Sequence, residues 1–460
     1  MTPFKEPERE IPVVEHTDVV VCGGGPAGVC AAIAAARTGV RTRLIEVHGC
    51  LGGVWTAGVL SWIIDSADKP GVMAGITGEL ERRGARATRV PGGKNFAYDV
   101  EAMKLLLEEM CLEAGVEVRL HTRVVAAARD SENRLAVVIT ESKSGREAWA
   151  AKAFVDGTGD GDLGKLAGCG FDMGHPETGA VQPMSLVGLV TGIRFSEVEP
   201  FVGGGLNAPK ERLLAEMHRA GVSPSYAKPT LFRIHEELFA LVANHQYNTD
   251  ATDADAVTRA TLEARREVHG LVAGLRSLGG VWQGLSLVAT GNQIGVREAR
   301  RVHGRYTVSR EDLLTGACHD DAVCRVTMGI DVHSTNEAKT RGIESKPFKS
   351  RPYDIPLRAL IAKDVDGLLL AGRCISGDFL AHSSYRVTGN AAAMGQAAGA
   401  TAALCAKLDL MPHEVPWDGV SQALAVLNGQ EGSQKGSVQY SCSRRIGIDA
   451  FRAITGIFQR

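Results

Sequence analysis

The sequence predicts an α/β fold in which a parallel sheet covered by helices is joined to a second, α+β domain. Three observations support this prediction. An apolar run at 18–21 precedes three glycines and an alanine-rich stretch at 27–38 that has the length and composition of a helix. A second apolar run follows at 41–46. A strand, a helix and a strand in this order form the βαβ unit of a parallel sheet.

Gly23, Gly25 and Gly28 lie between the first strand and the helix with the spacing GxGxxG. In such a turn the first glycine permits a tight bend, the second lets the backbone approach a pyrophosphate, and the third lets the helix pack on the strand. The start of the helix adds free N–H groups that favour phosphate. Glu46 ends the second strand, where a carboxylate can accept both hydroxyls of an adenosine ribose. We therefore predict a Rossmann-like dinucleotide site; an unrelated glycine-rich turn, the alternative, would leave Glu46 without a role.

Four later segments favour FAD as the dinucleotide. The pair Gly52–Gly53 in "LGGVWTAG" resembles the extended fingerprint of glutathione-reductase-type flavoproteins, and "FVDGTGD" at 154–160 resembles the turn that closes the first half of their FAD domain. "GLLLAGR" at 367–373 and the Gly/Ala-rich helix at 389–399 resemble their last strand and helix, which approach the flavin. A helix that merely packs closely on a sheet would have the same composition, and both interpretations can hold together.

Together these segments resemble the broad FAD-dependent oxidoreductase family, which is related to the fumarate-reductase and succinate-dehydrogenase flavoproteins. In the succinate-dehydrogenase relatives a histidine near the Gly52–Gly53 loop is linked covalently to the flavin. Here Trp55 occupies that neighbourhood, so the resemblance implies non-covalent FAD, with His48 and Cys50 as alternative attachment points. The seven segments that carry the resemblance are "CGGGPAGVCAAIAAARTGVRTRLIE", "LGGVWTAG", "YDVEAMKLLLEEMCLEAGVEVRLHTRV", "VDGTGDGDLGKLAG", "GNQIGVREARRVHGRY", "YDIPLRALIAKDVDGLLLAGRCISGD" and "AHSSYRVTGNAAAMGQAAG".

The glycine spacing and the resemblance together predict the residues that contact FAD. In the family, the strand after the helix at 98–115 offers backbone groups to the adenine, which makes Val124 a candidate. The predicted residues are Gly23, Gly25, Pro26, Ala27, Gly28, Glu46, Gly52, Gly53, Trp55, Thr56, Val124, Thr158, Gly159, Asp160, Gly372, Arg373, Asp378, Gly389, Asn390 and Ala391.

The FAD-binding domain is predicted to be discontinuous. Its first part is 1–175, a substrate or cap domain with a helical insertion is 176–355, and the second FAD-binding part with C-terminal helices is 356–460. Within these parts the sequence predicts a β-hairpin or meander over 126–150 with a turn at 142–146, strands at 181–193, 285–289 and 324–332, a largely helical insertion over 208–276, a helix opening near 297–301, and a helix at 421–427.

Composition narrows the class of partner. The 460 residues carry a net charge of −2, which gives no electrostatic reason to expect nucleic acid or an anionic membrane as a partner. The ten cysteines form no CxxC pair, so we expect neither a zinc site nor a disulfide framework. The first ten residues are polar and no apolar run reaches 18 residues, which predicts a cytoplasmic protein. Its expected partners are a small-molecule substrate and an unidentified electron acceptor, and both a monomer and a homo-oligomer stay open.

Candidate catalytic residues cluster between the last strand and helix of the FAD domain. His382, Tyr385 and Arg386 in "AHSSYR" would lie beside the flavin, with His382 as a base and Arg386 holding a carboxylate or the flavin O2. His333, at the end of an apolar strand, is a second candidate base. The alternatives are that Arg386 pairs with a structural acid and that both histidines are structural. Likewise "REARR" at 297–301 either supplies an arginine to the site or forms a salt-bridged domain junction through a Glu–Arg pair three residues apart.

We expect an FAD-dependent enzyme that transfers a hydride between flavin N5 and a small polar substrate, hydroxylated and sugar-like by analogy. Reduction of an activated C=C bond, as in the fumarate-reductase relatives, is an alternative in which Arg386 and Arg300 would serve. Glycoside cleavage through transient sugar oxidation and a non-catalytic FAD-binding partner protein are further alternatives.

Overall fold

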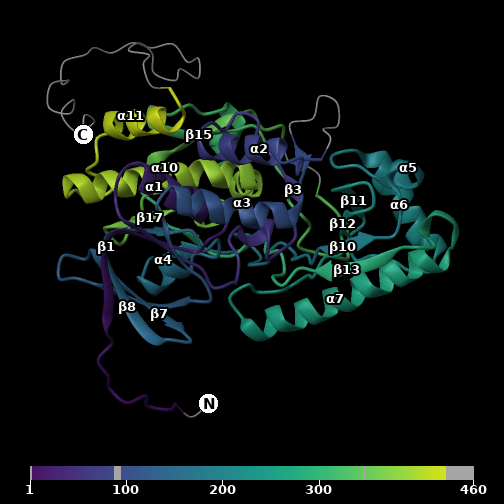
Figure 1. Cartoon of the computed structure of the whole chain (residues 1–460), viewed down its shortest axis with the longest axis horizontal. Helices are drawn as coiled ribbons and strands as arrows, with labels where there is room; N and C mark the ends of the chain where they lie inside the picture. The colour runs from purple at the N-terminus through teal and green to yellow at the C-terminus, as the bar shows by residue number, and fades with distance from the viewer. Residues whose placement is uncertain (1–2, 88–94, 345–347, 431–460) are drawn as a thin grey trace.

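A mainly parallel sheet forms the centre of the larger domain (Figure 1). The computed structural model describes residues 3–87, 95–344 and 348–430. Across the sheet the parallel strands run in the order β5 (Glu117–Arg119), β2 (Thr42–Ile45), β1 (Val13–Cys22), β8 (Gly145–Asp156) and β17 (Leu368–Leu370). The strands predicted at 18–21 and 41–46 are therefore neighbours, and the strand predicted at 367–370 joins the same parallel sheet on the far side of β8, which confirms the Rossmann-like α/β fold.

An antiparallel meander extends this sheet. β6 (Arg123–Arg129) pairs with β7 (Leu135–Ser142), and β7 pairs with the first half of β8 as far as the contact between Ser142 and Gly145. The hairpin predicted over 126–150, with its turn at 142–146, is confirmed. β8 thus pairs with β1 on one side and, on the other, with β7 along its first half and with β17 along its second half.

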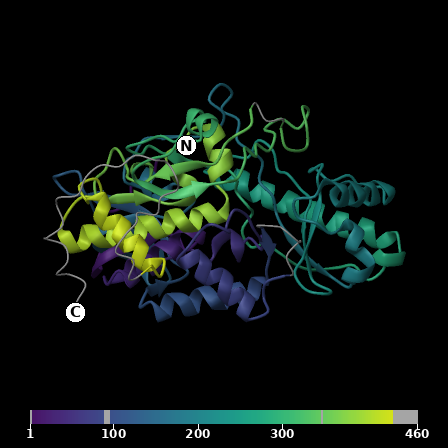
Figure 2. The ribbon, with the colours of Figure 1, turned by 90° about the horizontal axis from the view of Figure 1, so that it is seen from above.

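Helices stack on one face of the sheet, as Figures 1 and 2 show. α1 (Pro26–Arg37) and α10 (Thr388–Leu408) pack against each other unusually closely. A Cβ added to Gly395 or Gly399 of α10 would come within 2.1 or 2.0 Å of a backbone oxygen of α1, so only glycine fits there. The outer helices are α2 (Val72–Arg82), α3 (Val100–Glu113) and α11 (Trp417–Leu427).

The second domain is built on a four-stranded antiparallel sheet with its own apolar core. Its strand order is β11 (Thr230–Arg233), β12 (Phe239–Val242), β10 (Gly188–Thr191) and β13 (Ser286–Thr290). The long helix α7 (Ala254–Ser277) and α6 (Asn207–Arg219) flank it at the right of Figure 1.

The helical insertion predicted over 208–276 is therefore only partly right, because the β11–β12 hairpin divides it. The hairpin has the sequence "TLFRIHEELFALV". A charged turn in it separates two short apolar strands, which pair with each other. The strands predicted at 181–193 and 324–332 are shorter than expected, as β10 and β15 (Ala322–Val326).

Short elements complete the fold, and one of them corrects a prediction. No helix begins near 297–301; Arg301 and Val302 instead form β14, which pairs with β9. The other short elements are β3 (Trp62–Ile63), β4 (Phe96–Ala97), α4 (Asp162–Leu166), β9 (Phe171–Asp172), α5 (Phe195–Val198), α8 (Arg310–Thr315), β16 (Tyr353–Pro356) and α9 (Phe379–Tyr385).

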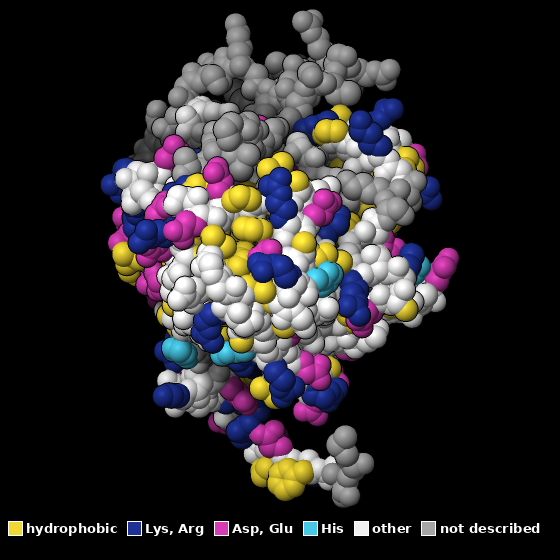
Figure 3. Space-filling view, turned by 90° about the vertical axis from the view of Figure 1, so that its right-hand side faces the viewer, with side chains coloured by type: hydrophobic (Ala, Val, Ile, Leu, Met, Phe, Trp, Pro, Cys, Tyr) yellow, Lys and Arg dark blue, Asp and Glu magenta, His cyan; other side chains and the backbone are white. Residues whose placement is uncertain are grey.

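The predicted domain boundary at 355 crosses a pair of strands. β15 pairs with β16 and also packs against α10, so this part of the predicted cap domain contacts the FAD-binding domain directly. None of the helices that the structure describes is long and apolar enough to cross a membrane. On the face at the right-hand end of Figure 1, hydrophobic side chains gather near the centre among lysines and arginines (Figure 3). The part of the predicted C-terminal segment beyond 430 lies outside the described residues. The structure contains a single chain, so the homo-oligomer stays a prediction.

Candidate active site

The turns that follow β1, β2 and β8 meet at one edge of the parallel sheet. The N–H of Gly52 donates to the carbonyl of Gly24 (2.7 Å), and the N–H of Gly157 donates to the carbonyl of Cys22 (2.8 Å). Backbone hydrogen bonds therefore join segments that lie up to 135 residues apart in the sequence. Side chains are nearly absent here because glycines occupy most of these positions.

The glycines of the first turn leave room only on the side that faces the start of α1. A Cβ on Gly28 would lie 1.7 Å from the carbonyl oxygen of Gly23, and Gly23 has φ +94°, which L side chains rarely adopt. At Gly25, which precedes α1, an added Cβ would meet nothing closer than 3.9 Å, and no side chain caps the helix. This open helix N-terminus has the geometry that binds phosphate.

Glu46 lies between the first two turns and is only 4% exposed. Its carboxylate accepts hydrogen bonds from the N–H groups of Gly24 (2.5 Å) and His48 (2.8 Å). Its carbonyl accepts from the N–H of Thr122 (2.9 Å), two residues before Val124 on β6. Glu46 and Val124 thus lie near the same edge, as predicted, although no contact in the structure assigns either of them to an adenosine.

Buried donors without partners surround the same edge. Among the described residues, Trp55 Nε1, Asn390 Nδ2 and Arg373 Nη1 are buried and have no hydrogen-bond partner, while Arg373 Nη2 pairs with Asp160 (2.8 Å). A buried donor is costly unless it is bonded, so these three favour a ligand rich in acceptors. The phosphates and ring carbonyls of FAD would supply such acceptors, and the residues present therefore fit that cofactor.

The remaining predicted contacts are of two kinds. Thr56, Thr158 and Asp378 already use their side chains within the protein: Thr56 donates to Leu51 O, Thr158 donates to Asp156 (2.6 Å), and Asp378 accepts from Ala381 N (2.7 Å) to cap α9. The others line the edge mainly through backbone: Pro26 and Ala27 in the first turn of α1, Gly53 in the second turn, Gly159 beside Arg373, Gly372 beside Ala27, and Gly389 and Ala391 in the first turn of α10.

His382 lies in α9, between the last parallel strand and α10, and is completely buried. Neither of its ring nitrogens has a hydrogen-bond partner among the described residues. Burial lowers the pKa of His382 well below its ordinary value, and the charges of Arg386 and Arg301 lower it further. The imidazole is therefore neutral at pH 7 and has a lone pair free to accept a proton.

Tyr385 and Arg386 follow His382 but are held differently. The Tyr385 hydroxyl donates to the carbonyl of Ile375 (3.0 Å), and burial raises the pKa of that hydroxyl well above its ordinary value. Arg386 donates to two backbone carbonyls, those of Asp331 (2.7 Å) and Arg297 (3.1 Å). The alternative in which Arg386 pairs with a structural acid is thus not what the structure shows, since its bonds go to backbone.

A chain of four polar side chains lies beside Arg386. Asp331 and His333 Nε2 are 3.3 Å apart, His333 Nδ1 and His245 Nε2 are 2.9 Å apart, and His245 Nδ1 and the Tyr247 hydroxyl are 3.1 Å apart. The ring of Tyr226 packs against both histidines. His333, a predicted site residue, is therefore linked by hydrogen bonds to a histidine 88 residues away.

The charges in this chain fix the direction of its hydrogen bonds. Burial alone would raise the pKa of Asp331, but His333 and the nearby arginines outweigh it, so the carboxylate is ionised. Burial, reinforced by Arg297, lowers the pKa of His333 to about 4, and burial also lowers the pKa of His245. We infer that neutral His333 donates from Nε2 to Asp331, accepts from His245 at Nδ1, and that His245 accepts from Tyr247.

Sequence reasoning missed His245, Tyr247 and Tyr226. The available signal was "ANHQYN", in which a histidine lies three residues after the end of the buried apolar strand β12. For "REARR" the structure confirms the Glu–Arg pair, because Glu298 and Arg301 form a buried ion pair. Glu298 also accepts from the N–H groups of Gly174 and Gln182 (both 3.1 Å), so this pair joins the two domains.

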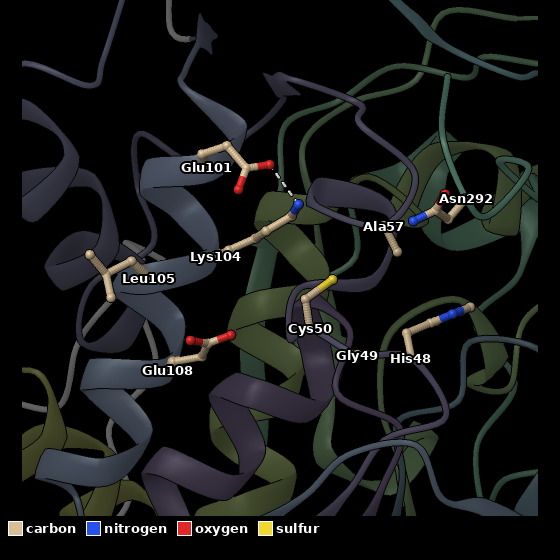
Figure 4. Close-up of a pocket in the computed structure, with 9 residues that line it drawn as sticks. All are labelled: His48, Gly49, Cys50, Ala57, Glu101, Lys104, Leu105, Glu108 and Asn292. Carbon is tan, nitrogen blue, oxygen red and sulfur yellow. Dashed lines mark hydrogen bonds and ion pairs between the residues drawn. The ribbon is translucent and has the colours of Figure 1, made fainter. Parts of the chain in front are cut away.

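A separate pocket of 420 Å³ lies between α3 and the loop that follows Glu46 (Figure 4). Glu101 and Lys104 of α3 form an ion pair (2.6 Å) on one wall, and Cys50 lies opposite, with its Sγ 3.7 Å from the Thr56 hydroxyl. The lining has both charges, and Glu101 and Lys104 pair with each other, while Glu108 adds a second carboxylate. His48 also lines this pocket, so both alternative attachment residues face it.

Comparison with known proteins decides the family. Residues 18–424 match the family described as FAD dependent oxidoreductase. The chain belongs to this family. As an FAD-dependent oxidoreductase it is an enzyme and a flavoprotein, and FAD is its cofactor, which agrees with the buried donors and the open helix N-terminus described above. Whether the FAD is non-covalent stays a prediction.

Individual relatives match only a short part of this FAD-dependent oxidoreductase. A dihydrolipoyl dehydrogenase of Trypanosoma brucei brucei is 51% identical over 45 residues, which is 10% of this chain and 9% of that protein. A leghemoglobin reductase of Glycine max is 56% identical over 39 residues, 8% of each chain. The chain thus matches less than a tenth of the length of either relative.

Solved structures resemble the chain over more of its length at low identity. A geranylgeranyl bacteriochlorophyll reductase-like protein of Thermoplasma acidophilum covers 90% of this chain and 84% of its own, with 12% identity and a TM-score of 0.42. The myxobacterial chondrochloren halogenase CndH covers 90% of this chain and 78% of its own, with 15% identity and a TM-score of 0.46.

Proposed function

We propose that this oxidoreductase transfers a hydride between flavin N5 and a small hydroxylated substrate, with a buried neutral histidine as the base. His382 carries the proposal, because it is completely buried, uncharged and has both ring nitrogens unbonded within the described residues. FAD, when bound, supplies the two-electron acceptor or donor. The protein has to supply the place where the coupled proton goes.

A neutral imidazole suits this task. An alcohol that loses a hydride must also lose its hydroxyl proton, and a general base contributes about 10²–10⁴-fold to such a step. His382 lies in α9, directly before α10, whose first turn holds the unbonded amide of Asn390. His333 is the second candidate, since its chain of hydrogen bonds to His245 and Tyr247 could pass a proton onward.

Anaerobic bleaching of the bound flavin tests this proposal. Oxidised holoenzyme is mixed with polyols, sugars and hydroxy acids, and the flavin absorbance near 450 nm is followed. We expect His382→Ala to retain FAD but to lose bleaching at least a hundredfold. His269→Ala, an exposed histidine on α7, is the matched control and should bleach normally. If His382→Ala bleaches normally while His333→Gln does not, the base is His333; if both bleach normally, neither histidine is the base.

Arg386 favours a second candidate, the reduction of an activated C=C bond. Burial lowers the pKa of Arg386 to about 10, which makes the guanidinium a better proton donor than an exposed arginine. Its hydrogen bonds go to backbone carbonyls, and the nearby Asp331 carboxylate only partly offsets the effect of burial on its pKa. Reoxidation of photoreduced enzyme by a small enoate, but not by Arg386→Gln, would favour this reaction over hydride abstraction from an alcohol.

A further inference from the structure

The chain of polar side chains beside Arg386 uses both ring nitrogens of each of its histidines. Its members, in order, are Asp331, His333, His245 and Tyr247, and the atoms that meet in successive pairs are 3.3, 2.9 and 3.1 Å apart. An imidazole bonded on both sides can accept a proton at one nitrogen and release another from the second nitrogen. We call these four side chains the histidine chain.

The histidine chain has a buried middle and two accessible ends. His333 is 7% exposed and His245 is 2% exposed. By contrast, the Asp331 side chain keeps 24% of its surface exposed, and Tyr247 is also partly exposed. The chain therefore joins two accessible surfaces through a buried stretch of the protein.

The Tyr247 end is the one that faces solvent. The next residue, Asn248, is exposed and lines a pocket of 670 Å³, whose wall also includes Thr335, two residues from His333. Burial raises the pKa of Tyr247 to about 12, so its hydroxyl keeps its proton at neutral pH and acts as a donor to His245. Solvent reaches Tyr247 here and can replace a proton that the hydroxyl gives up.

The Asp331 end lies against α9, at the junction of the domains. The N–H of Asp331 donates to the carbonyl of Ser383 (3.3 Å), the residue after His382, and the carbonyl of Asp331 accepts from Arg386 (2.7 Å). α9 leads directly into α10, whose first turn holds the unbonded amide of Asn390 that favours FAD. Asp331 is therefore the end of the chain that lies on the side of the cofactor.

A purely structural role leaves part of the histidine chain unexplained. One histidine, His333, is enough to bond the Asp331 carboxylate. Continuing the chain through His245 to Tyr247 buries a second imidazole, although an apolar side chain would fill that space without the cost of burying a polar group. The ring of Tyr226 packs against both histidines and holds them in line. What the extension adds is a continuous path from the junction to the surface.

We propose that the histidine chain carries a proton between solvent at Tyr247 and the flavin site beside Asp331. Electrons that reach or leave FAD without a hydride are accompanied by a proton, which has to cross the protein. The proposal concerns this exchange and so does not rest on the substrate proposed above.

The hydrogen bonds of the histidine chain point inward, in the direction that flavin reduction requires. Tyr247 passes its proton to Nδ1 of His245, and His245 passes the proton of its Nε2 to Nδ1 of His333. His333 passes the proton of its Nε2 to Asp331, which releases one to the reduced site. Tyr247 regains a proton from solvent, so one proton enters, one leaves and the charge of the chain is unchanged. Every bond then points outward, and the same path can return a proton when FAD is reoxidised.

Flash reduction of the holoenzyme tests the proposal without a substrate. Photoexcited deazaflavin with EDTA as the sacrificial donor supplies the electrons. The flavin absorbance reports when they arrive, and a pH-indicator dye reports the proton taken from solvent. We expect Tyr247→Phe to take up the proton at least about tenfold more slowly, while the electrons arrive at the unaltered rate. A merely structural role would slow both signals or neither.

Two further variants keep the test decisive. Tyr306→Phe is the matched control, because it removes a partly exposed hydroxyl that donates to Asp312 (2.7 Å) and not to the histidine chain; its proton uptake should be normal. His245→Gln interrupts the chain at its middle and should be slow as well, so it decides the question should Tyr247→Phe not fold. The proposal is overturned if a folded variant of either residue takes up the proton at the unaltered rate, or if the electrons are delayed by the same factor. Slow proton uptake in these variants of an enzyme that no alcohol bleaches would leave the histidine chain standing and reject the proposed function.

Discussion

The cofactor edge and the domain junction are built in opposite ways. At the edge of the parallel sheet, segments meet mainly through glycine backbone, as between Gly52 and Gly24, and the Glu46 carboxylate adds a side-chain link. At the junction, by contrast, side chains make the contacts. Imidazoles, a carboxylate and arginines from several distant segments form one connected group. The edge leaves no room for a side chain at Gly23 or Gly28, whereas the junction depends on which charged groups are present.

This difference explains why one fold can serve many reactions. A site made of backbone recognises what all relatives share, the phosphates and sugar of a dinucleotide. A site made of side chains can change its ligand through single substitutions that leave the backbone in place. Substitutions at the edge should therefore prevent cofactor binding, while substitutions at the junction should change the catalysed reaction or the local stability.

The largest expected effect comes from closing the edge with a side chain. Gly28→Val would place its Cβ 1.7 Å from the carbonyl oxygen of Gly23, a clash with backbone that no rotamer relieves. We expect purified protein without yellow colour and with a strongly lowered melting temperature. Gly78→Ala on α2 is the matched control, because nothing lies within 4 Å of the added Cβ, and it should stabilise the protein by about 0.5–1 kcal/mol. A yellow Gly28→Val protein would contradict the close packing described for the edge.

Next in size is the buried ion pair that joins the domains. Glu298→Gln would leave the buried Arg301 guanidinium without its counter-charge, and breaking such a pair costs about 3–5 kcal/mol. Urea unfolding followed by circular dichroism measures the loss. Glu79→Gln, which removes an exposed pair with Arg82, should leave the free energy of unfolding unchanged. If both variants behave alike, the Glu298 pair is not the domain link that its burial suggests.

The histidine chain should make stability depend on pH. The pKa of His333 is about 4 in the folded protein and about 6.5 in the unfolded chain, so the unfolded state binds the proton more tightly. The stability that neutral His333 provides is complete above pH 6.5 and is lost as the pH falls towards 4. From pH 7 to pH 5 this residue alone should account for about 2 kcal/mol.

Denaturant unfolding at the two pH values checks this prediction. His333→Gln should show a decline between pH 7 and pH 5 that is smaller by about that amount. The remaining decline would come from His245 and His382, whose pKa values burial also lowers. An equal decline in both proteins would mean that His333 is protonated or exposed in the folded state, and the inferred direction of its hydrogen bonds would be wrong.

How much the sequence could predict follows from the same comparison. The edge lies within short segments whose spacing is itself the signal, so Gly23, Gly28 and the turns after 51 and 156 were found from local pattern. The β11–β12 hairpin was missed because short apolar runs near helices give no decisive period. The length of β10 and the strand at Arg301 depend on partners far along the chain, which no local pattern reveals.

The junction was predicted only in fragments for a physical reason. His333, His382 and Arg386 stood out as polar residues at the ends of apolar segments, but their partners come from elsewhere. His245 is 88 residues from His333, and Arg386 is 55 residues from Asp331, to whose carbonyl it donates. Only the packing of the second domain on the first brings these groups together, and a single sequence contains no distance between them.

The smallest expected effect separates Tyr385 from its neighbour His382. Its hydroxyl is committed to the carbonyl of Ile375, so Tyr385→Phe should cost about 1–2 kcal/mol of stability through one lost buried hydrogen bond. Because no proton-accepting group of the site depends on that hydroxyl, flavin bleaching by substrate should stay within about twofold of the unaltered rate. Rapid-mixing kinetics with the substrate found in the bleaching screen measures this directly. A tenfold slower bleaching in a protein of normal stability would instead give Tyr385 the catalytic role that its place in the sequence predicted, and would extend the functional part of the junction into α9 beyond His382.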